Sequence, residues 1–301
     1  MRTVYLGTSQ FAATVLEHLA AGPHRPQLVI TRPDRPRGRG KKLAAPPVAE
    51  AARALGLDFS PPEDVNGEET LARMATVEPE TVCVCAYGAL IREPLLSAHP
   101  MLNMHPSLLP RWRGAAPVER AIMAGDAETG VAIMQLTAGL DSGPVALCER
   151  TAISEEDTYG TLSTRLADLG SELLSRALDD PPPFAEQPED GVTYAEKITA
   201  EDRRLDPARP AAELARTVRA LTPHIGAALE LPDGSRLGVR AAREDVSIEV
   251  TEGALEAREG RLWLGCREGA LELLEVQPPG GRAMPAADYV RGNRGFDRPM
   301  R

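Results

Sequence analysis

Short runs of β-forming residues alternate with helical patterns over the first two hundred residues. The apolar runs at 3–6, 28–31 and 81–86 have the length and composition of buried strands. Between the first two runs lies a segment whose apolar residues share one helix face, with Ser9 in place to cap it. These apolar residues are Phe11, Val15, Leu16 and Leu19. Because this order is typical of parallel βαβ units, we expect an α/β fold with a Rossmann-like parallel sheet in the N-terminal domain.

The pattern changes after three consecutive prolines within residues 179–185, which neither a helix interior nor a central strand accepts. Further on, a helical segment at 211–221 precedes short β-rich runs. The sequences at 232–234 and 267–269 are typical of turns between strands. The expected parts are an N-terminal domain at 1–180, a linker at 181–204 and a small β-barrel or sandwich at 205–301.

The composition narrows the class of protein. Hydrophobic residues make up 43% of the chain and charged residues 26%, as in ordinary globular proteins. No run of about 18 apolar residues is present to span a bilayer. The opening residues, MRTVYLGTSQF, resemble a strand rather than a signal peptide. We therefore expect a soluble, cytoplasmic protein with no membrane association.

The motifs of several enzyme classes are missing from the sequence. Cys83, Cys85, Cys148 and Cys266 lack the paired spacing of a metal site, so we expect no bound metal and four buried, reduced thiols. The turn that starts at Gly7 lacks the G-x-G-x-x-G pattern of a dinucleotide site. G-x-S-x-G and H-E-x-x-H are also missing. A metal-free acyl transfer without a covalent intermediate fits better than hydrolysis by a nucleophile.

Three polar residues are candidates for such chemistry. Asn103 and His105 are two positions apart, so a strand that ends at His105 places both side chains on one face. An amide can donate a hydrogen bond to a developing oxyanion, and a histidine can move protons near neutral pH. Asp141, between two glycines, can orient the histidine and stabilise its charged form. Each residue alone is more often an ordinary turn residue, so the hypothesis depends on their combination.

Asn103, His105, the sequence Ser-Leu-Leu-Pro at 107–110 and Asp141 together resemble the core motif of the folate-dependent formyltransferases. The resemblance implies that 10-formyltetrahydrofolate binds beside this segment as the formyl donor. It also implies that Asn103, His105 and Asp141 are the catalytic residues. The implied folate contacts are Ser107, Leu108, Leu109 and Pro110.

The core motif does not choose the acceptor, because the family contains enzymes that formylate a purine-precursor amine, a sugar-nucleotide amine or an aminoacyl-tRNA. The segments at 31–48, 108–126 and 271–292 resemble the members that act on aminoacyl-tRNA. This resemblance implies methionyl initiator tRNA as the acceptor and an OB-like β-barrel as the C-terminal domain. A sugar-nucleotide acceptor and a tRNA-binding module with an idle folate pocket are the alternatives.

The segment at 31–48 favours RNA on its charge alone. It holds six basic residues and one acidic residue in a chain whose formal net charge is −10. Gly38 and Gly40 give it the backbone freedom to fit around phosphates, although a solvated charged loop is the alternative. An exposed basic RNA surface also leads us to expect a monomer. The predicted RNA contacts are Arg32, Arg35, Arg37, Arg39, Lys41 and Lys42.

Two departures from the family pattern lie outside the predicted catalytic residues. His224 stands where the family commonly has tryptophan, so we expect altered packing or an altered RNA contact there. After Asp141 the chain continues Ser-Gly-Pro-Val, where threonine and methionine are more familiar.

Overall fold

The structure is a computed structural model that describes residues 1–37 and 42–293. The chain divides into two compact units. The first unit comprises Met1–Pro117, Glu128–Ala152 and Ser163–Ala195. The second unit comprises Val118–Ala127, Ile153–Leu162 and Glu196–Arg301. The domain limits expected from the sequence stay predictions.

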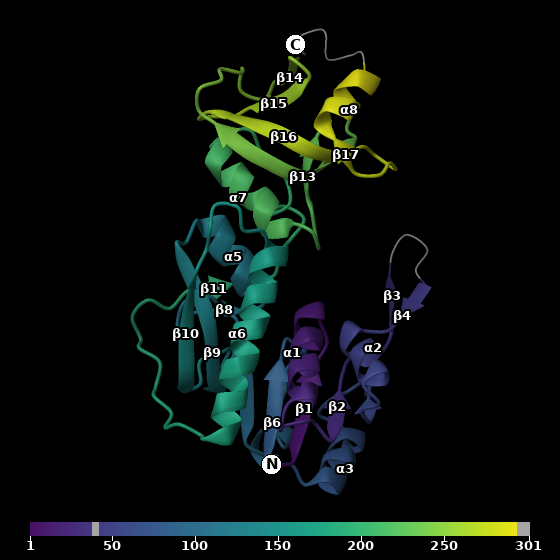
Figure 1. The fold of residues 1–301 in the computed structure, drawn as a ribbon, viewed down its shortest axis with the longest axis vertical. Coiled ribbons are helices and arrows are strands. Elements are labelled where there is room, and N and C mark those ends of the chain that lie inside the picture. The colour runs from purple at the N-terminus through teal and green to yellow at the C-terminus, as the bar shows by residue number, and fades with distance from the viewer. Residues whose placement is uncertain (38–41, 294–301) are drawn as a thin grey trace. The chain divides into compact units, whose positions relative to one another are not determined.

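Seven strands form the central sheet of the first unit (Figure 1). They are β1 (Thr3–Gly7), β2 (Leu28–Ile30), β5 (Phe59–Ser60), β6 (Thr81–Cys85), β7 (Met101–His105), β9 (Glu128–Gln135) and β10 (Val145–Ala152). Their order is β10-β9-β7-β6-β1-β2-β5, and β1, β2, β5, β6 and β7 are parallel. β9 is antiparallel to both of its neighbours. The sheet confirms the predicted α/β fold, with a Rossmann-like and mostly parallel arrangement.

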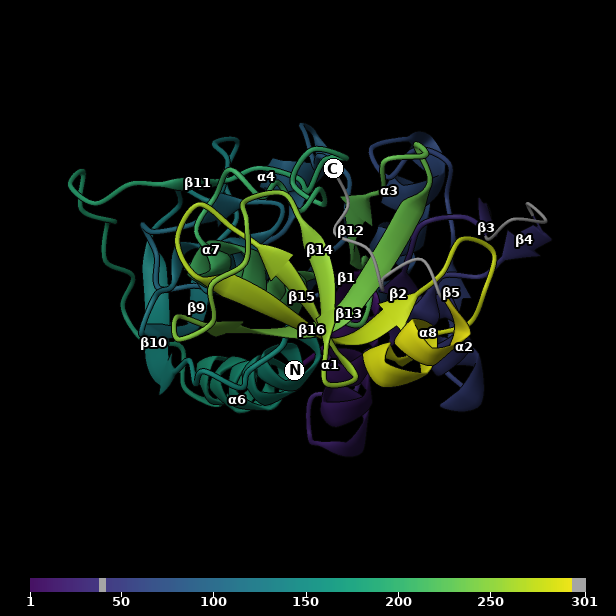
Figure 2. The same ribbon diagram turned by 90° about the horizontal axis from the view of Figure 1, so that it is seen from above.

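Helices cover both faces of this sheet (Figure 2). They are α1 (Gln10–Ala21), α2 (Pro47–Ala54), α3 (Glu68–Val77), α4 (Leu95–Ala98) and residues 163–179 of α6 (Tyr159–Asp179). Val4 and Leu6 of β1 pack in one apolar cluster with Met74 of α3 and Leu95 of α4. Tyr5, between them, points to the opposite face and donates a hydrogen bond to the Ala12 carbonyl of α1 at 2.6 Å. The alternation along β1 therefore separates the two helical layers.

The first helix begins as the sequence predicts. The backbone N–H of Ala12 donates to Ser9 Oγ at 3.2 Å, which satisfies one of the free N–H groups of the first turn. Such a cap contributes about 1 kcal/mol to stability. The residues of the predicted apolar face are all buried. They are Phe11, Val15, Leu16 and Leu19.

The cysteines follow the prediction in three cases out of four. Cys83, Cys85 and Cys266 are buried and free. Burial raises the pKa of the Cys83 and Cys85 thiols to about 12, so neither is a thiolate at neutral pH. The prediction that Cys148 is buried is wrong, because β10 is an edge strand that pairs only with β9 in the sheet and leaves this residue exposed.

The second unit contains a six-stranded antiparallel sheet. Its strands are β12 (Ala227–Glu230), β13 (Arg236–Asp245), β14 (Leu255–Arg258), β15 (Arg261–Gly265), β16 (Ala270–Gln277) and β17 (Met284–Pro285). Their order is β12-β13-β16-β15-β14, and β17 pairs with β16. The predicted turns at 232–234 and 267–269 are confirmed between β12 and β13 and between β15 and β16.

The helical segments of this unit within the described residues are α7 (Ala211–Leu221), α8 (Ala286–Gly292), residues 118–124 of α5 (Pro117–Ala124) and residues 159–162 of α6. The helix predicted at 211–221 is confirmed as α7. Its buried residues Leu214 and Val218 pack in one apolar cluster with Leu237 of β13 and Leu271 of β16. Burial of the apolar face of α7 in this cluster stabilises the helix, because the same face would be exposed to water without the sheet.

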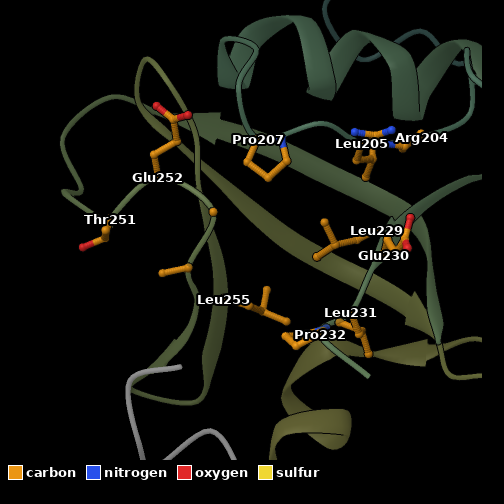
Figure 3. A pocket seen from close by; sticks show the side chains of 12 residues that line it. Arg204, Leu205, Pro207, Leu229, Glu230, Leu231, Pro232, Thr251, Glu252 and Leu255 are labelled. Atoms are coloured by element: carbon orange, nitrogen blue, oxygen red, sulfur yellow. The ribbon is translucent and has the colours of Figure 1, made fainter. Parts of the chain in front are cut away.

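The predicted barrel is not closed. Within residues 42–293 no ladder joins the two edge strands β12 and β14. A cavity of about 750 Å³ lies at this open side, with Leu229 of β12 and Leu255 of β14 in its lining (Figure 3). The segment at 204–207 also lines the cavity and hydrogen-bonds to β12 through the Leu205 N–H and the Ala228 carbonyl. The structure therefore shows a C-terminal β domain, and its OB-like character stays a prediction.

His224 has a packing role in the second unit. Its ring stacks on Tyr159 with 3.6 Å between the centroids, and its Nε2 lies 2.9 Å from Glu119 Oε1. Glu119 is buried, so a polar partner of this kind offsets the cost of removing its carboxylate from water. The altered packing or altered RNA contact expected at this departure from the family pattern stays a prediction.

Candidate active site

Asn103 and His105 share one face of β7. Met104, between them, lies on the α6 side, where a Cβ atom on Gly170 of α6 would be 2.2 Å from Met104 Cε. Since successive side chains of a strand alternate, Asn103 and His105 point to the opposite face. They are only 7% and 4% exposed, so their polar atoms need partners inside the protein.

Asp141 supplies part of that partnership. Its Oδ2 lies 3.6 Å from His105 Nδ1, and its Oδ1 accepts a hydrogen bond from Asn103 Nδ2 at 3.4 Å. The backbone N–H of Gly114 donates to Asp141 Oδ2 at 2.8 Å and holds the carboxylate in place. The structure therefore brings together the three residues that the sequence predicts as catalytic.

The other ring nitrogen of His105 is held by the backbone. Nε2 lies 2.8 Å from the carbonyl oxygen of Trp112, and because a carbonyl only accepts, Nε2 carries a proton. In the neutral ring Nδ1 is then an acceptor that faces the carboxylate of Asp141. In the charged ring both nitrogens carry protons; Nε2 donates to the Trp112 carbonyl, and Nδ1 lies at ion-pair distance, 3.6 Å, from Asp141 Oδ2. The arrangement is thus suited to a histidine that becomes positively charged during a reaction.

Two glycines allow the close approach of the segments that carry these contacts. Gly114 has a φ of 120°, and a Cβ atom there would be 2.8 Å from the Ala195 carbonyl oxygen. A Cβ atom on Gly143 would be 2.0 Å from the Gln135 carbonyl oxygen. Both positions therefore exclude a side chain, and Gly143 keeps the Asp141 turn close to the end of β9.

The predicted folate-contacting segment follows β7 directly. Ser107 is fully buried, and its hydroxyl donates to the Arg111 carbonyl at 2.7 Å, so it stabilises the local turn. Leu108, Leu109 and Pro110 are half-buried. Their apolar side chains are partly accessible and can contact the ring system of a folate.

Three of the predicted RNA-contacting residues lie in two short strands that pair antiparallel, Arg35 and Arg37 in β3 (Arg35–Arg37) and Lys42 in β4 (Lys42–Ala44), and these strands are called the basic hairpin below. Arg32 is half-buried, whereas Lys42 and Arg35 are exposed, with Arg35 Nη2 3.1 Å from Glu63 Oε2. Arg37 lies in β3, and nothing further is described of its side chain. Arg39 and Lys41 lie outside the described residues.

The basic hairpin and the three polar residues belong to the same edge of the sheet. The hairpin follows the carboxyl end of β2, and His105 is the last residue of β7. Because β2 and β7 are parallel, both ends lie at one edge, where open α/β sheets bind ligands. Two strands stand between them, which corresponds to about 14 Å at the usual strand spacing.

Several contacts at this site were missed from the sequence. The Trp112 carbonyl and the Gly114 N–H are backbone groups, so their residue types carry no signal of this role. Gln187, whose side chain contacts the Asp141 turn, lies in the proline-rich segment expected to be a linker. The two-residue strands β8 (Arg113–Gly114) and β11 (Tyr194–Ala195), which pair in parallel, are too short for a recognisable pattern.

Within residues 1–37 and 42–293 no three His, Cys, Asp or Glu side chains lie close enough together to hold a metal ion. No helix in those residues is long and apolar enough to cross a membrane.

Known proteins resemble this chain over nearly its whole length. Residues 1–178 match the family model described as formyl transferase, and residues 197–294 match the formyl transferase C-terminal domain. The protein named methionyl-tRNA formyltransferase from Paracoccus denitrificans is 43% identical over 97% of both chains. The protein of the same name from Methylobacterium sp. is 44% identical over 98% of this chain and 97% of its own.

A solved structure agrees with the fold. HypX from Aquifex aeolicus in complex with tetrahydrofolic acid has a TM-score of 0.66 over 96% of this chain, with 17% sequence identity. This chain spans only 47% of that protein, and at this identity the similarity concerns the fold alone.

Proposed function

This chain belongs to the formyl transferase family, and we propose that it transfers the formyl group of 10-formyltetrahydrofolate to the α-amine of methionyl initiator tRNA. The observation that carries the proposal is the cluster of Asn103, His105 and Asp141 in a chain with both family domains. An amide donor, an imidazole and a carboxylate are a suitable set for direct acyl transfer to an amine.

In the proposed mechanism the neutral α-amine of the acceptor attacks the formyl carbon, and the bond between that carbon and the folate nitrogen then breaks. Asn103 donates from Nδ2 to the formyl oxygen as negative charge develops on it. His105, whose Nε2 donates to the Trp112 carbonyl, takes on Nδ1 the proton that the amine loses and passes it to the folate nitrogen, so that tetrahydrofolate leaves. In its charged form the ring also stabilises the negative oxygen. Asp141 stabilises the charged ring through Nδ1. The half-buried Leu108, Leu109 and Pro110 contact the folate.

The charge of the basic hairpin and the names of the relatives both support tRNA as the acceptor. The basic hairpin lies at the same edge of the sheet as the catalytic residues, within reach of an acceptor arm whose end carries the reacting amine. A small amine substrate needs no such hairpin. The relatives that match this chain over 97% of its length carry the name of the tRNA enzyme. A sugar-nucleotide amine is the second candidate acceptor.

The second unit, the oligomeric state and the compartment complete the proposal. We take the second unit to be an OB-like, tRNA-binding domain, which the irregular register of β13 with β16 between Val239 and Ala242 supports, since bulges increase the twist that a barrel needs. A monomer in the cytoplasm, where charged tRNA is used, is the proposed working form.

The proposed function is tested by transfer of labelled formyl from 10-formyltetrahydrofolate to charged initiator tRNA. Charged elongator methionine tRNA and free methionine serve as parallel acceptors. We expect labelling that is selective for the initiator. Transfer only to a sugar-nucleotide amine would replace the acceptor and keep the reaction, and folate binding without turnover on any amine would favour a tRNA-binding module instead.

The role of the basic hairpin is tested by salt. Replacing Arg39, Lys41 and Lys42 together by alanine is expected to weaken tRNA binding and to flatten the slope of log K against log salt by about 2 to 3, because each lost phosphate contact removes 0.7 to 0.9. The affinity for folate should not change.

A matched control for the hairpin is available in the same unit. Arg150 and Arg176 are 73% and 63% exposed and pair with surface glutamates, so replacing both by alanine removes exposed positive charge elsewhere. The control should keep the wild-type slope. An unchanged salt slope in the hairpin variant would mean that the segment at 31–48 is a solvated charged loop that makes no phosphate contacts.

A further inference from the structure

Gln187 makes an unusual number of contacts for a residue in a proline-rich segment. Its Nε2 donates to the carbonyl oxygens of Asp141 at 2.8 Å and of Gly143 at 2.7 Å. Its Oε1 accepts from Arg113 Nε at 3.0 Å and from Arg113 Nη2 at 2.8 Å. One amide side chain therefore connects the Asp141 turn to β8, although it lies 46 residues from Asp141 along the chain.

The backbone around Gln187 is fixed on both sides. Before it, Ala185 forms an antiparallel bridge with Val145, the first residue of β10. After it, the Thr193 hydroxyl accepts from the Trp112 N–H at 2.8 Å, and the Thr193 carbonyl accepts from the Arg113 N–H at 2.9 Å. The segment thus lies across the two loops that supply the contacts of His105 and Asp141.

The Asp141 turn needs such support. Asp141 has a φ of 44°, in the left-handed region that residues with a side chain avoid. A residue in this conformation returns to a commoner one unless its neighbours hold it. The Gln187 amide bonds to the carbonyl of Asp141 itself, and the Arg113 that it also binds precedes Gly114, whose N–H holds the Asp141 carboxylate.

We propose that Gln187 is a positioning residue for the formyl transfer, acting through Asp141. It keeps the Asp141 carboxylate beside Asn103 and His105 by fixing the turn to β8. The inference rests on the proposed function of this site. It predicts that loss of the amide lowers the rate of the reaction and leaves substrate binding intact. Gln187 contacts Asp141 only through the backbone, so its loss shifts the carboxylate relative to Asn103 and His105 without removing a reacting group.

Two substitutions separate the contacts. Gln187→Leu removes all of them, whereas Gln187→Glu keeps an acceptor for Arg113 and lacks the N–H groups that bond the Asp141 and Gly143 carbonyls. We expect kcat to fall about 10- to 100-fold in both variants with little change in either KM, since misplacement of a reacting group by about 1 Å has effects of this size. A role limited to holding the segment would leave Gln187→Glu with a near-normal kcat.

Asn66→Leu is the matched control. In the first unit Asn66 Nδ2 donates to Asp64 Oδ1 and to the Leu90 carbonyl, and its Oδ1 accepts from the Arg92 N–H, so its loss removes a similar set of amide hydrogen bonds. This variant should keep the wild-type kcat. A thermal melt of all three variants identifies any that fails to fold.

A double-mutant cycle with Asp141→Asn decides whether Gln187 acts through Asp141. We expect Gln187→Leu to have little further effect on kcat once the carboxylate is lost, because the two changes remove the same function. Equal losses in both backgrounds, or a near-normal kcat in Gln187→Leu, would overturn the inference. If the wild-type chain itself transfers no formyl group to any amine, the proposed function fails before this inference is reached.

Discussion

Replacing Asn103 by alanine is expected to lower kcat about 10²- to 10³-fold, the usual effect of losing one donor to a developing oxyanion. Asn103 is buried, and its described partner is Asp141 Oδ1 at the long distance of 3.4 Å. Because this hydrogen bond is long, the Asn103 amide can donate instead to the substrate oxygen as negative charge develops on that oxygen. Because that charge is absent before the reaction, the affinities for tRNA and folate should change little.

The measurement is single-turnover formyl transfer with saturating tRNA, together with a separate binding titration. Asn66→Ala is a suitable control, since Asn66 also carries a bonded amide in the first unit, with contacts to Asp64 and to the Leu90 carbonyl. Near-normal turnover in Asn103→Ala would show that the formyl oxygen is stabilised by other groups. A loss of tRNA affinity instead would assign Asn103 to acceptor binding.

The parts of the fold that the sequence predicts are those with a local signal. The runs at 3–6, 28–31 and 81–86 became β1, β2 and β6 because buried parallel strands are apolar along their whole length. The cap at Ser9 and the helix at 211–221 also depend on neighbours within one or two turns. The shared face of Asn103 and His105 follows from the period of a strand alone.

Features that depend on the order of strands in a sheet could not be predicted from the sequence. Cys148 is exposed because β10 is an edge strand of the sheet, and the order of strands in a sheet is set by pairing between distant segments. The open side of the C-terminal sheet depends on whether β12 and β14 meet, and these strands lie far apart in sequence. Such pairings depend on three-dimensional packing rather than on local propensity.

The residues that hold the loops of the candidate site could not be predicted from the sequence either. Gln187 and the Thr193 hydroxyl reach the loops around Asp141 and Trp112 from a proline-rich segment with no periodic pattern. The positive φ of Asp141 could be suspected from its glycine neighbours, but not the contacts that hold it. The reacting groups were therefore predictable as residue types, and the groups that position them were visible only in three dimensions.

Replacing Asp141 by asparagine is expected to lower kcat about 10²- to 10⁴-fold, the range in which an oriented acid–base group contributes. Asparagine has nearly the same shape, so its Oδ1 can still accept from the Gly114 N–H and the turn can keep its form. What is lost is the negative charge 3.6 Å from His105 Nδ1. Since Nε2 already donates to the Trp112 carbonyl, the charged ring would then face an amide instead of a carboxylate.

His18 and Asp168 offer a control with the same chemistry. His18 Nε2 lies 3.6 Å from Asp168 Oδ1, and both side chains are about half exposed, at 45% and 54%. Asp168→Asn removes an equally spaced partner of a histidine, but at a position where water screens the charge. It should leave kcat unchanged.

The comparison of the two aspartate variants separates charge from structure. A large loss in Asp141→Asn with normal folding, and no loss in Asp168→Asn, would mean that the Asp141 carboxylate is required for the positive charge on His105 during transfer. If Asp141→Asn were nearly as active as the wild type, hydrogen bonding alone would suffice to orient His105. The formyl oxygen would then be stabilised chiefly by Asn103, and the Asn103→Ala variant would carry almost the whole catalytic effect of the three residues.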